Sequence, residues 1–195
     1  TKDIGLEFKT DTRFSYCNTN YAMLALIIEK ITKLSYEKAM KQIIFEPLGM
    51  KNTYVFDYER DKDSAVTSYK GNKVEIGLDY LDAVYGDKNI YSTPRDLLKF
   101  DRARNTPDFL TPEIISMVYT PYSNEHKGRK NYGLGIRMVN WETGQNFYFH
   151  NGWWHGNTSS YITLQKEGVT IIALSNKFTR KTYDVRKLAV LFGDY

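Results

Sequence analysis

The sequence predicts an α+β fold in which an antiparallel sheet packs against helices. Apolar residues recur at helical spacing in the first half of the chain, and from Tyr132 onward they alternate with the period of two that marks strands. The strand-like segments follow one another with short turns between them, which favours antiparallel pairing. The chain of 195 residues has the usual length of one domain. We expect helices and loops over residues 1–130, and the sheet with a C-terminal helix over residues 131–195.

Two helices are predicted near the N-terminal end. Asn18 or Thr19 can cap the first, and its apolar residues 21–28 lie on every side, which predicts a buried helix. Ser35 opens the second, and Pro47 and Gly49 end it. Residues 51–91 alternate turn signals with short apolar pieces, so we expect long loops with a short hairpin. The apolar face expected for the second helix consists of Tyr36, Ala39, Met40, Ile43 and Ile44.

The rest of the chain supplies two more helix starts and the sheet. Thr93-Pro94 and Thr111-Pro112 each place a capping threonine before a proline at the first helical position. The inner face of the first of these helices is expected to hold Leu97, Leu98 and Phe100. A helix over residues 182–193, with Val185, Leu188, Ala189 and Phe192 facing inward, closes the chain. The predicted strands are Tyr132–Asn140, Gln145–Asn151, Thr158–Gln165 and Val169–Ser175.

Composition excludes several classes of protein. Hydrophobic residues make up 42% of the chain and charged residues 26%, which is typical of a globular protein. No apolar run reaches the roughly 18 residues of a membrane span, and no secretory signal is visible. A net charge of +4 is far from the basic stripe of a nucleic-acid-binding protein, so we expect no nucleic-acid partner. A single cysteine, Cys17, excludes an internal disulfide and a thiolate metal cage.

The three histidines allow one metal-site alternative. His126 lies in a polar segment typical of a surface loop, His150 ends a predicted strand, and His155 lies in the turn that follows. His150 and His155 could bind zinc, but no carboxylate lies near them at ligand spacing. We therefore expect neither a metal nor another cofactor, and a metal assay tests this.

Six short segments, in the right order and nearly end to end, resemble the motifs of one enzyme superfamily: Tyr16-Cys17-Asn18, Pro47-Leu48-Gly49-Met50, Ser92-Thr93 with Asp96-Leu97, Tyr132-Gly133-Leu134-Gly135, His150-Asn151-Gly152 and Leu174-Ser175-Asn176. They are similar to segments of the serine β-lactamases and penicillin-binding proteins, in particular the class C β-lactamases and the related D-alanyl-D-alanine carboxypeptidases and esterases. The resemblance implies a partial fold of this superfamily, the DD-peptidase type.

The resemblance also implies a role for each candidate site residue. Tyr16 would be the general base that activates a serine nucleophile, and Asn18 would bond a catalytic lysine and the substrate amide. His150 would supply a positive charge or a hydrogen bond. Gly152 would let substrate approach its strand, where the backbone N–H of Trp153 would donate to the oxyanion. Each residue has a structural alternative: a core tyrosine at 16, a helix cap at 18 and a turn glycine at 152. The Trp153-Trp154 pair should direct one ring to each face of the sheet.

The nucleophile of this superfamily lies in a Ser-x-x-Lys segment upstream of the Tyr-x-Asn motif. Nothing upstream of Tyr16 matches, and Ser35-Tyr36-Glu37-Lys38 lies downstream, where a helix cap is expected. We therefore expect the C-terminal part of a longer serine hydrolase that cleaves a peptide, lactam or ester through an acyl-enzyme, and that is inactive alone. The alternative is a non-catalytic binding module for peptidoglycan-like peptides.

The same resemblance implies partners and a location. The substrate would be a small molecule or a peptide, and the location would be periplasmic or extracellular. Residues 169–175 are nearly continuously apolar, as in the middle of a sheet. In the superfamily, strands from the N-terminal end of the domain pair beside this strand. We therefore expect an exposed sheet edge here, which either a second copy of the chain or residues 4–8 would cover.

Overall fold

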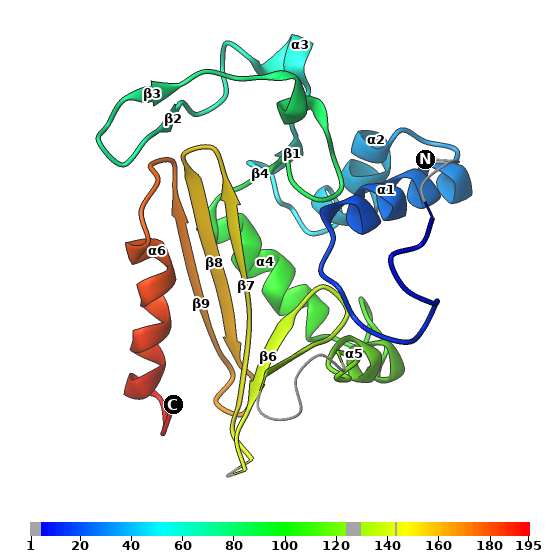
Figure 1. Ribbon diagram of the computed structural model, residues 1–195, viewed down its shortest axis with the longest axis vertical. Helices are drawn as coiled ribbons and strands as arrows, with labels where there is room; N and C mark the ends of the chain where they lie inside the picture. Colours follow the sequence, from blue (N-terminus) through cyan, green and yellow to red (C-terminus); the bar gives the residue numbers. More distant parts are fainter. Residues whose placement is uncertain (1–4, 124–129, 143) are drawn as a thin grey trace.

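The computed structural model describes residues 5–123, 130–142 and 144–195, and its centre is one antiparallel sheet. Consecutive strands pair with each other in the order β5-β6-β7-β8-β9 (Figure 1). Its pairing is most extensive between β7 and β8 and between β8 and β9, with seven residue pairs in each register. The predicted α+β class with an antiparallel sheet is therefore confirmed. The strands are β5 (Lys130–Tyr132), β6 (Arg137–Asn140), β7 (Asn146–Trp154), β8 (Asn157–Leu164) and β9 (Val169–Ser175).

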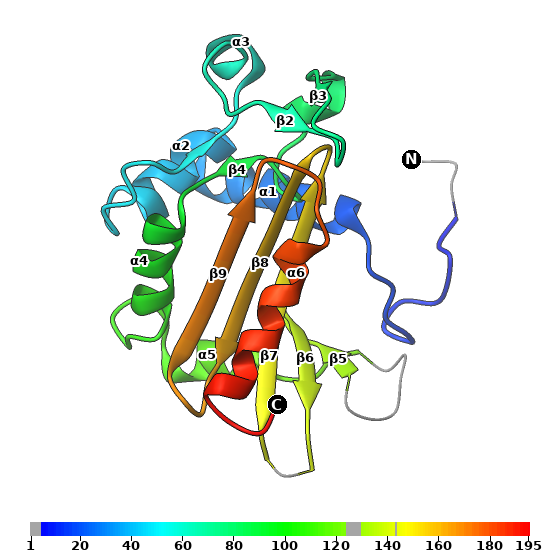
Figure 2. The ribbon, with the colours of Figure 1, turned by 90° about the vertical axis from the view of Figure 1, so that its left-hand side faces the viewer.

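Helices cover both faces of the sheet. The C-terminal helical segment lies across one face, and α1, α4 and α5 lie on the other side (Figures 1 and 2). The helices are α1 (Asn18–Thr32), α2 (Tyr36–Met40) with a π-helical continuation η1 (Lys41–Phe45), α4 (Pro94–Arg104), α5 (Pro112–Val118) and α6 (Lys181–Asp184), which continues as the 3₁₀ helix η3 (Val185–Leu191).

The segment between residues 51 and 91 consists of short elements joined by loops, as the sequence predicts. Two antiparallel pairs form here, β1 with β4 and β2 with β3. This segment lies above one end of the main sheet in Figure 1. Its elements are β1 (Tyr54–Val55), α3 (Tyr58–Asp61), β2 (Ser68–Tyr69), β3 (Glu75–Ile76), η2 (Tyr80–Ala83) and β4 (Ile90–Tyr91).

Three predicted helix caps are confirmed. The Ser35 side chain accepts a hydrogen bond from the Lys38 backbone N–H at the start of α2. Thr93 and Thr111 each do the same at the starts of α4 and α5, and in both helices a proline follows. At α1 the prediction is wrong, because the N-cap is Cys17, whose side chain makes no capping bond.

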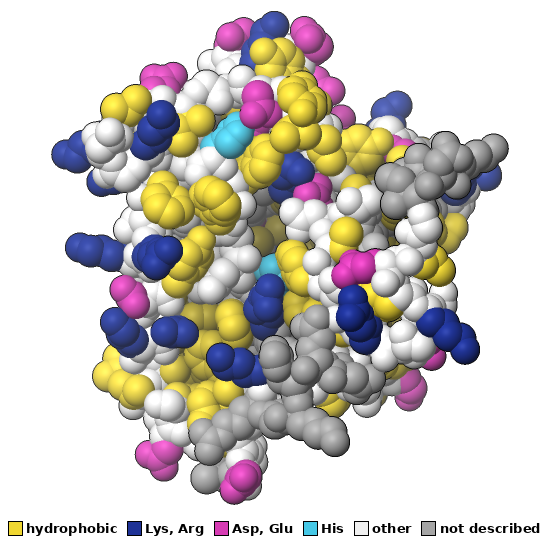
Figure 3. Space-filling model, viewed as in Figure 1, with side chains coloured by type: hydrophobic (Ala, Val, Ile, Leu, Met, Phe, Trp, Pro, Cys, Tyr) yellow, Lys and Arg dark blue, Asp and Glu magenta, His cyan; other side chains and the backbone are white. Residues whose placement is uncertain are grey.

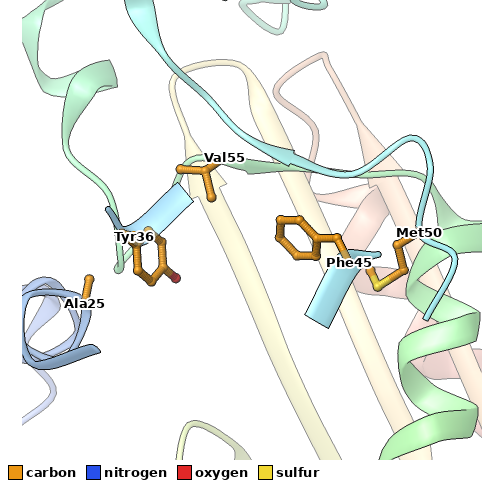
Figure 4. Close-up of a cluster of buried hydrophobic side chains, with 5 residues drawn as sticks. All are labelled: Ala25, Tyr36, Phe45, Met50 and Val55. Atoms are coloured by element: carbon orange, nitrogen blue, oxygen red, sulfur yellow. The ribbon is translucent and has the colours of Figure 1, made fainter. Parts of the chain in front are cut away.

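The buried apolar side chains form separate clusters. One joins α1, α2, η1 and β1 through Ala25, Tyr36, Phe45, Met50 and Val55 (Figure 4). A second lies between the sheet and the C-terminal segment, with Ile162, Leu164 and Ala189 almost fully buried. The sheet therefore has a packed core on its α6 face.

Further predictions about the elements are wrong, among them the inward position of Ile43, which is 52% exposed. Residues 132–140 form a hairpin of β5 and β6, because the chain turns back at residues 133–136, where Gly135 has a φ of 74°. Helix α1 buries only Ala25, and within residues 21–28 Met23, Leu24 and Ile27 are 52%, 50% and 48% exposed. Leu188 and Phe192 were expected to face inward but are 45% and 46% exposed. Val185 and Ala189 do face the sheet.

Some expectations cannot be compared with the structure. His126, Ile4 and Thr143, which lies between the first two predicted strands, are outside the described residues. Within the described part of the chain, no helix combines the length and the apolar character needed to cross a bilayer.

Candidate active site

The structure brings Tyr16 and His150 together, although 134 residues separate them in the sequence. Tyr16 lies in the extended segment just before α1, and His150 lies in the middle of β7. Their ring centroids are 6.2 Å apart. The ring of Tyr132, at the end of β5, lies 5.8 Å from Tyr16 and 6.1 Å from His150. One cluster thus collects a residue from each of three motifs.

A chain of hydrogen bonds determines which ring nitrogen of His150 carries the proton. Its Nδ1 lies 3.0 Å from the backbone oxygen of Asn151, which can only accept, so Nδ1 carries the proton. In a neutral ring Nε2 is then the acceptor, and the Tyr132 hydroxyl at 3.1 Å donates to it. The Tyr21 hydroxyl, 3.2 Å from that of Tyr132, completes the chain as a donor. Both nitrogens of His150 are therefore occupied.

Arg137 supplies the positive charge of this cluster. It is opposite Tyr132 in the β5–β6 register, and its guanidinium carbon lies 5.1 Å from the Tyr16 ring centroid and 5.6 Å from that of Tyr132. Burial, and then the charge of Arg137, lowers the pKa of His150, which favours a neutral hydrogen-bonding ring over a cation. Burial raises the pKa of Tyr16, and Arg137 opposes that rise. The phenol of Tyr16 is accordingly protonated at neutral pH unless a further cation lies near it.

A cleft of about 720 Å³ adjoins β7, and Gly152 and Trp153 line it. Figure 3 shows this side of the molecule hollowed near its centre, with a histidine and a Lys or Arg side chain beside the hollow.

Trp153 is 66% exposed, and its indole N–H donates to the backbone oxygen of His155. Trp154 is half-buried and donates to the Asp82 carboxylate. Asp87 and Lys88 form a largely buried ion pair of 2.8 Å in the same cleft.

Gly152 has a packing reason to be a glycine. It is directly opposite Ser159 in the β7–β8 register, and a Cβ at position 152 would lie 2.3 Å from the Ser159 hydroxyl oxygen. The backbone oxygen of Gly152 accepts a hydrogen bond from the Tyr183 hydroxyl. The structure therefore gives this residue a contact within the sheet, whatever its relation to substrate.

Two further residues of the motifs stand apart from the cluster. Asn18 is exposed in the first turn of α1, and its side chain makes no hydrogen bond with another described residue. Ser35 caps α2 and lies beyond the far end of α1, whose 15 residues rise about 22 Å. The Ser35-x-x-Lys38 segment is thus a helix start at the opposite end of α1 from Tyr16.

Sequence reasoning gave no role to Arg137, Tyr21 or Tyr132. Two glycines in the segment Tyr132-Gly133-Leu134-Gly135 are the signal that could have revealed the hairpin, and with it the pairing of Tyr132 with Arg137. In the structure, the two histidines of the zinc alternative have different neighbours. His155 contacts Asp79 and Asp82, from a segment about 75 residues away, whereas His150 contacts tyrosines.

Comparison with known proteins gives one consistent result. A model of the family described as Beta-lactamase matches residues 2–193. Penicillin-binding protein 4* of Bacillus subtilis is 29% identical over 205 aligned residues, which cover 95% of this chain and 46% of that protein. Teichoic acid D-alanine hydrolase of Staphylococcus aureus is 31% identical over 115 residues, which cover 57% of this chain and 29% of that protein.

A solved structure agrees with the sequence comparisons. The penicillin binding protein from Bacillus halodurans superposes with a TM-score of 0.82 at 18% identity, over 96% of this chain and 59% of that one. This likeness confirms the predicted fold. The chain spans about half or less of the length of the first curated relatives that it matches.

Proposed function

The chain belongs to the beta-lactamase family, and from this premise we propose that it forms the C-terminal part of a serine hydrolase that works through an acyl-enzyme. The observation that carries the proposal is the cluster of Tyr16, Tyr132 and His150, which are drawn from three separate segments. The nucleophile would come from a segment outside these 195 residues. The partial coverage of the relatives supports this division.

In the proposed reaction Tyr16 is the proton acceptor. Its phenolate takes the proton from a serine hydroxyl while the serine oxygen bonds to the acyl carbon of the substrate. Tyr16 then returns that proton to the leaving group, and water later hydrolyses the ester that remains. Because burial raises the pKa of Tyr16, Arg137 alone does not make the phenolate abundant at pH 7. We assign the additional cation to the lysine of a Ser-x-x-Lys segment.

The proposed substrates are peptides, amides or esters of D-amino acids. Two relatives, a penicillin-binding protein and a teichoic acid D-alanine hydrolase, support this class. Arg137 has no carboxylate partner among the described residues, so its charge is free to attract an anionic group of the substrate beside Tyr16. Because these relatives are a penicillin-binding protein and a teichoic acid D-alanine hydrolase, we propose a site of action in the cell envelope or outside the cell.

Covalent labelling tests the proposal. The 195-residue chain and the longer product of its gene are incubated with a fluorescent penicillin and with a reactive ester, and the adduct is located by mass spectrometry. We expect label on a serine of an upstream Ser-x-x-Lys in the longer product and none on the chain alone. Stoichiometric label on Ser35 of the chain would contradict the proposal.

Substitution of Tyr16 tests its role in the longer product. Tyr16→Phe should lower the rate of acylation by about 10²- to 10⁴-fold, the usual contribution of a general base. Tyr58→Phe, on α3, is the matched control and should leave the rate unchanged. A gene that encodes no upstream Ser-x-x-Lys, together with peptide binding that leaves no adduct, would instead favour the non-catalytic binding module.

A further inference from the structure

A histidine lies between two carboxylates at the far end of β7, away from the Tyr16 cluster. His155 occupies the turn between β7 and β8, and Asp79 and Asp82 belong to the capped turn of η2. The Nε2 of His155 is 3.2 Å from Asp79 Oδ2, and its Nδ1 is 3.6 Å from Asp82 Oδ2. One possible ligand atom from each residue lies within 4.8 Å of the other two. Three residues with metal-ligating atoms, from two distant segments, thus lie within reach of one ion.

The two ring nitrogens of His155 cannot both be satisfied in a neutral imidazole. A neutral ring has one N–H and one lone pair, so one of the nitrogens directs a lone pair at a carboxylate oxygen. A second proton on that nitrogen, or a metal cation bound by both the nitrogen and the facing oxygen, removes this repulsion. The 3.2 Å between Nε2 and Asp79 Oδ2 is close to the edge of a tetrahedron around Zn²⁺, which is roughly 3.3 Å for ligands about 2.0 Å from the ion.

The surroundings suit a bound cation. The side chains of Asp82 and His155 are 3% and 19% exposed, whereas that of Asp79 is 46% exposed and leaves one side open to solvent. The two carboxylates outnumber the single imidazole, so the cluster carries excess negative charge. The nearby cation, Lys88, is already paired with Asp87 and lies over the Trp154 ring. Asp82 is held by hydrogen bonds from Trp154 Nε1 and from the Asp79 backbone N–H, as a carboxylate ligand usually is.

The backbone around the cluster is held in place at some conformational cost. His155 has a φ of 50°, which is uncommon for a residue with a side chain. Its neighbour Gly156 packs so tightly on Tyr69 that a Cβ would lie 2.3 Å from the Tyr69 backbone oxygen. Asn157 donates to Ser68 in the same region. The turn therefore presents His155 from a rigid support, which a metal site requires.

We propose that Asp79, Asp82 and His155 form a binding site for a divalent transition-metal ion, with Zn²⁺ as the fitting example. One nitrogen and two carboxylate oxygens are ligands that Zn²⁺ accepts, and the exposed side leaves room for water as a fourth ligand. The bound ion would tie η2 to the β7–β8 turn, directly beyond the Gly152-Trp153 wall of the cleft. The site is separate from the proposed acylation chemistry and does not depend on it.

Titration of the metal-free protein with Zn²⁺ by calorimetry tests this site. The protein carries Cys17→Ser, because Cys17 is exposed and a thiolate would bind zinc by itself. The pH is 7.5, because protons compete with the metal for its ligands at lower pH. We expect one Zn²⁺ per chain, a higher melting temperature with Zn²⁺ and no comparable effect of Mg²⁺, which prefers an all-oxygen site.

Two variants and their controls decide the outcome. His155→Gly removes a ligand while the glycine suits the positive φ, and Asp79→Asn removes one charge but keeps the oxygen that caps η2. Each should weaken Zn²⁺ binding by more than the roughly 10- to 100-fold that follows the loss of an outer-shell partner. His126→Gln and Asp108→Asn are the matched controls and should bind like the parent. Equal Zn²⁺ affinity in the parent and in His155→Gly, or no binding by the parent, would overturn the proposal. The cluster would then be an ion pair between a protonated His155 and the two aspartates.

Discussion

The protonation state of His150 follows from the atoms around its ring and makes stability depend on pH. Burial and Arg137 lower its pKa in the folded chain below the ordinary value of about 6.5. Below that value the unfolded chain binds a proton that the folded chain resists, so the free energy of unfolding falls as the pH falls. The contribution of neutral His150 to the free energy of unfolding is complete above pH 6.5. It is lost as the pH drops through the pKa that His150 has in the folded chain.

His150→Gln should remove this part of the pH dependence. Urea unfolding of both proteins at pH 7.5 and at pH 5 measures the effect as a double difference, which cancels all other titrating groups. We expect a smaller loss of stability between the two pH values in the variant than in the parent. Tyr58→Phe is the control and should follow the parent. An equal loss in His150→Gln and the parent would show that His150 titrates normally in the folded chain.

The contact between Gly152 and Ser159 makes it possible to test whether packing, rather than substrate approach, requires a glycine at position 152. Gly152→Ala should cost about 1–3 kcal/mol of stability, because its Cβ would lie 2.3 Å from the Ser159 oxygen. In a Ser159→Ala background the nearest remaining side-chain atom is the Cβ of residue 159 at 3.6 Å, an ordinary contact, so the cost should shrink. A double-mutant cycle by urea unfolding measures the coupling. Equal costs in both backgrounds would mean that the steric contact does not constrain residue 152.

At the scale of elements, α4 is attached to the rest of the molecule by buried charges more than by apolar side chains. Its buried residues are Asp96, Asp101 and Arg104, while Leu98 of the predicted inner face is 37% exposed. Asp101 accepts hydrogen bonds from Arg104, from the Tyr161 hydroxyl of β8 and from the Thr170 hydroxyl of β9. This one carboxylate therefore joins α4 to two strands.

Asp101→Ala should be strongly destabilising, by about 3–5 kcal/mol, because it leaves the buried guanidinium of Arg104 without its counter-charge. Asp101→Asn keeps the shape of the side chain and should lose less stability. The control is Asp108→Ala, an exposed position shortly after α4, where we expect a change within about 0.5 kcal/mol. Chemical unfolding measures all three. A loss below 1 kcal/mol in Asp101→Ala would contradict the proposed anchoring role of the carboxylate.

Elements with local signals could be predicted, and elements that depend on distant partners could not. Thr93-Pro94 specifies a helix start by itself, because the cap and the fixed φ of proline act within one turn. The pattern of α1 indicates burial but not the partner that provides it, and in the described chain Ile31 stays 76% exposed. In the sequence, the charged residues of α4 indicate a solvent-facing surface. Their burial could not be predicted, because only the fold brings Tyr161 and Thr170 to Asp101.

The same division applies to the candidate site. Tyr16 and His150 were selected from motifs, and the structure places their rings together. The roles assigned to them, and to Asn18, Gly152 and Trp153, stay predictions. Arg137 carries no motif of its own, and Asp79 and Asp82 lie about 75 residues from His155, so sequence spacing could not connect them.

At the scale of the whole molecule, the sheet ends at its most apolar strand. β9 pairs with β8 along its full length, and no other described strand pairs with residues 169–175. Past its end, the strand-like pairing among the described residues is limited to an isolated bridge between Lys177 and Tyr69. Helix α4 contacts β9 from one face, through Thr170, and does not supply a ladder. An unpaired strand edge of this kind is a template for pairing with another chain.

We therefore expect the chain to self-associate through β9 as its concentration rises. Sedimentation velocity over a concentration series should show a shift from monomer to a larger species. Leu174→Lys places a charge on β9, where Leu174 is 38% exposed, and should move the equilibrium back to monomer because edge lysines oppose strand pairing. Leu188→Lys is the matched control on η3, where Leu188 is 45% exposed, and should associate like the parent. If only the control variant became monomeric, the C-terminal segment would be the contact surface, and the β9 edge would not drive association.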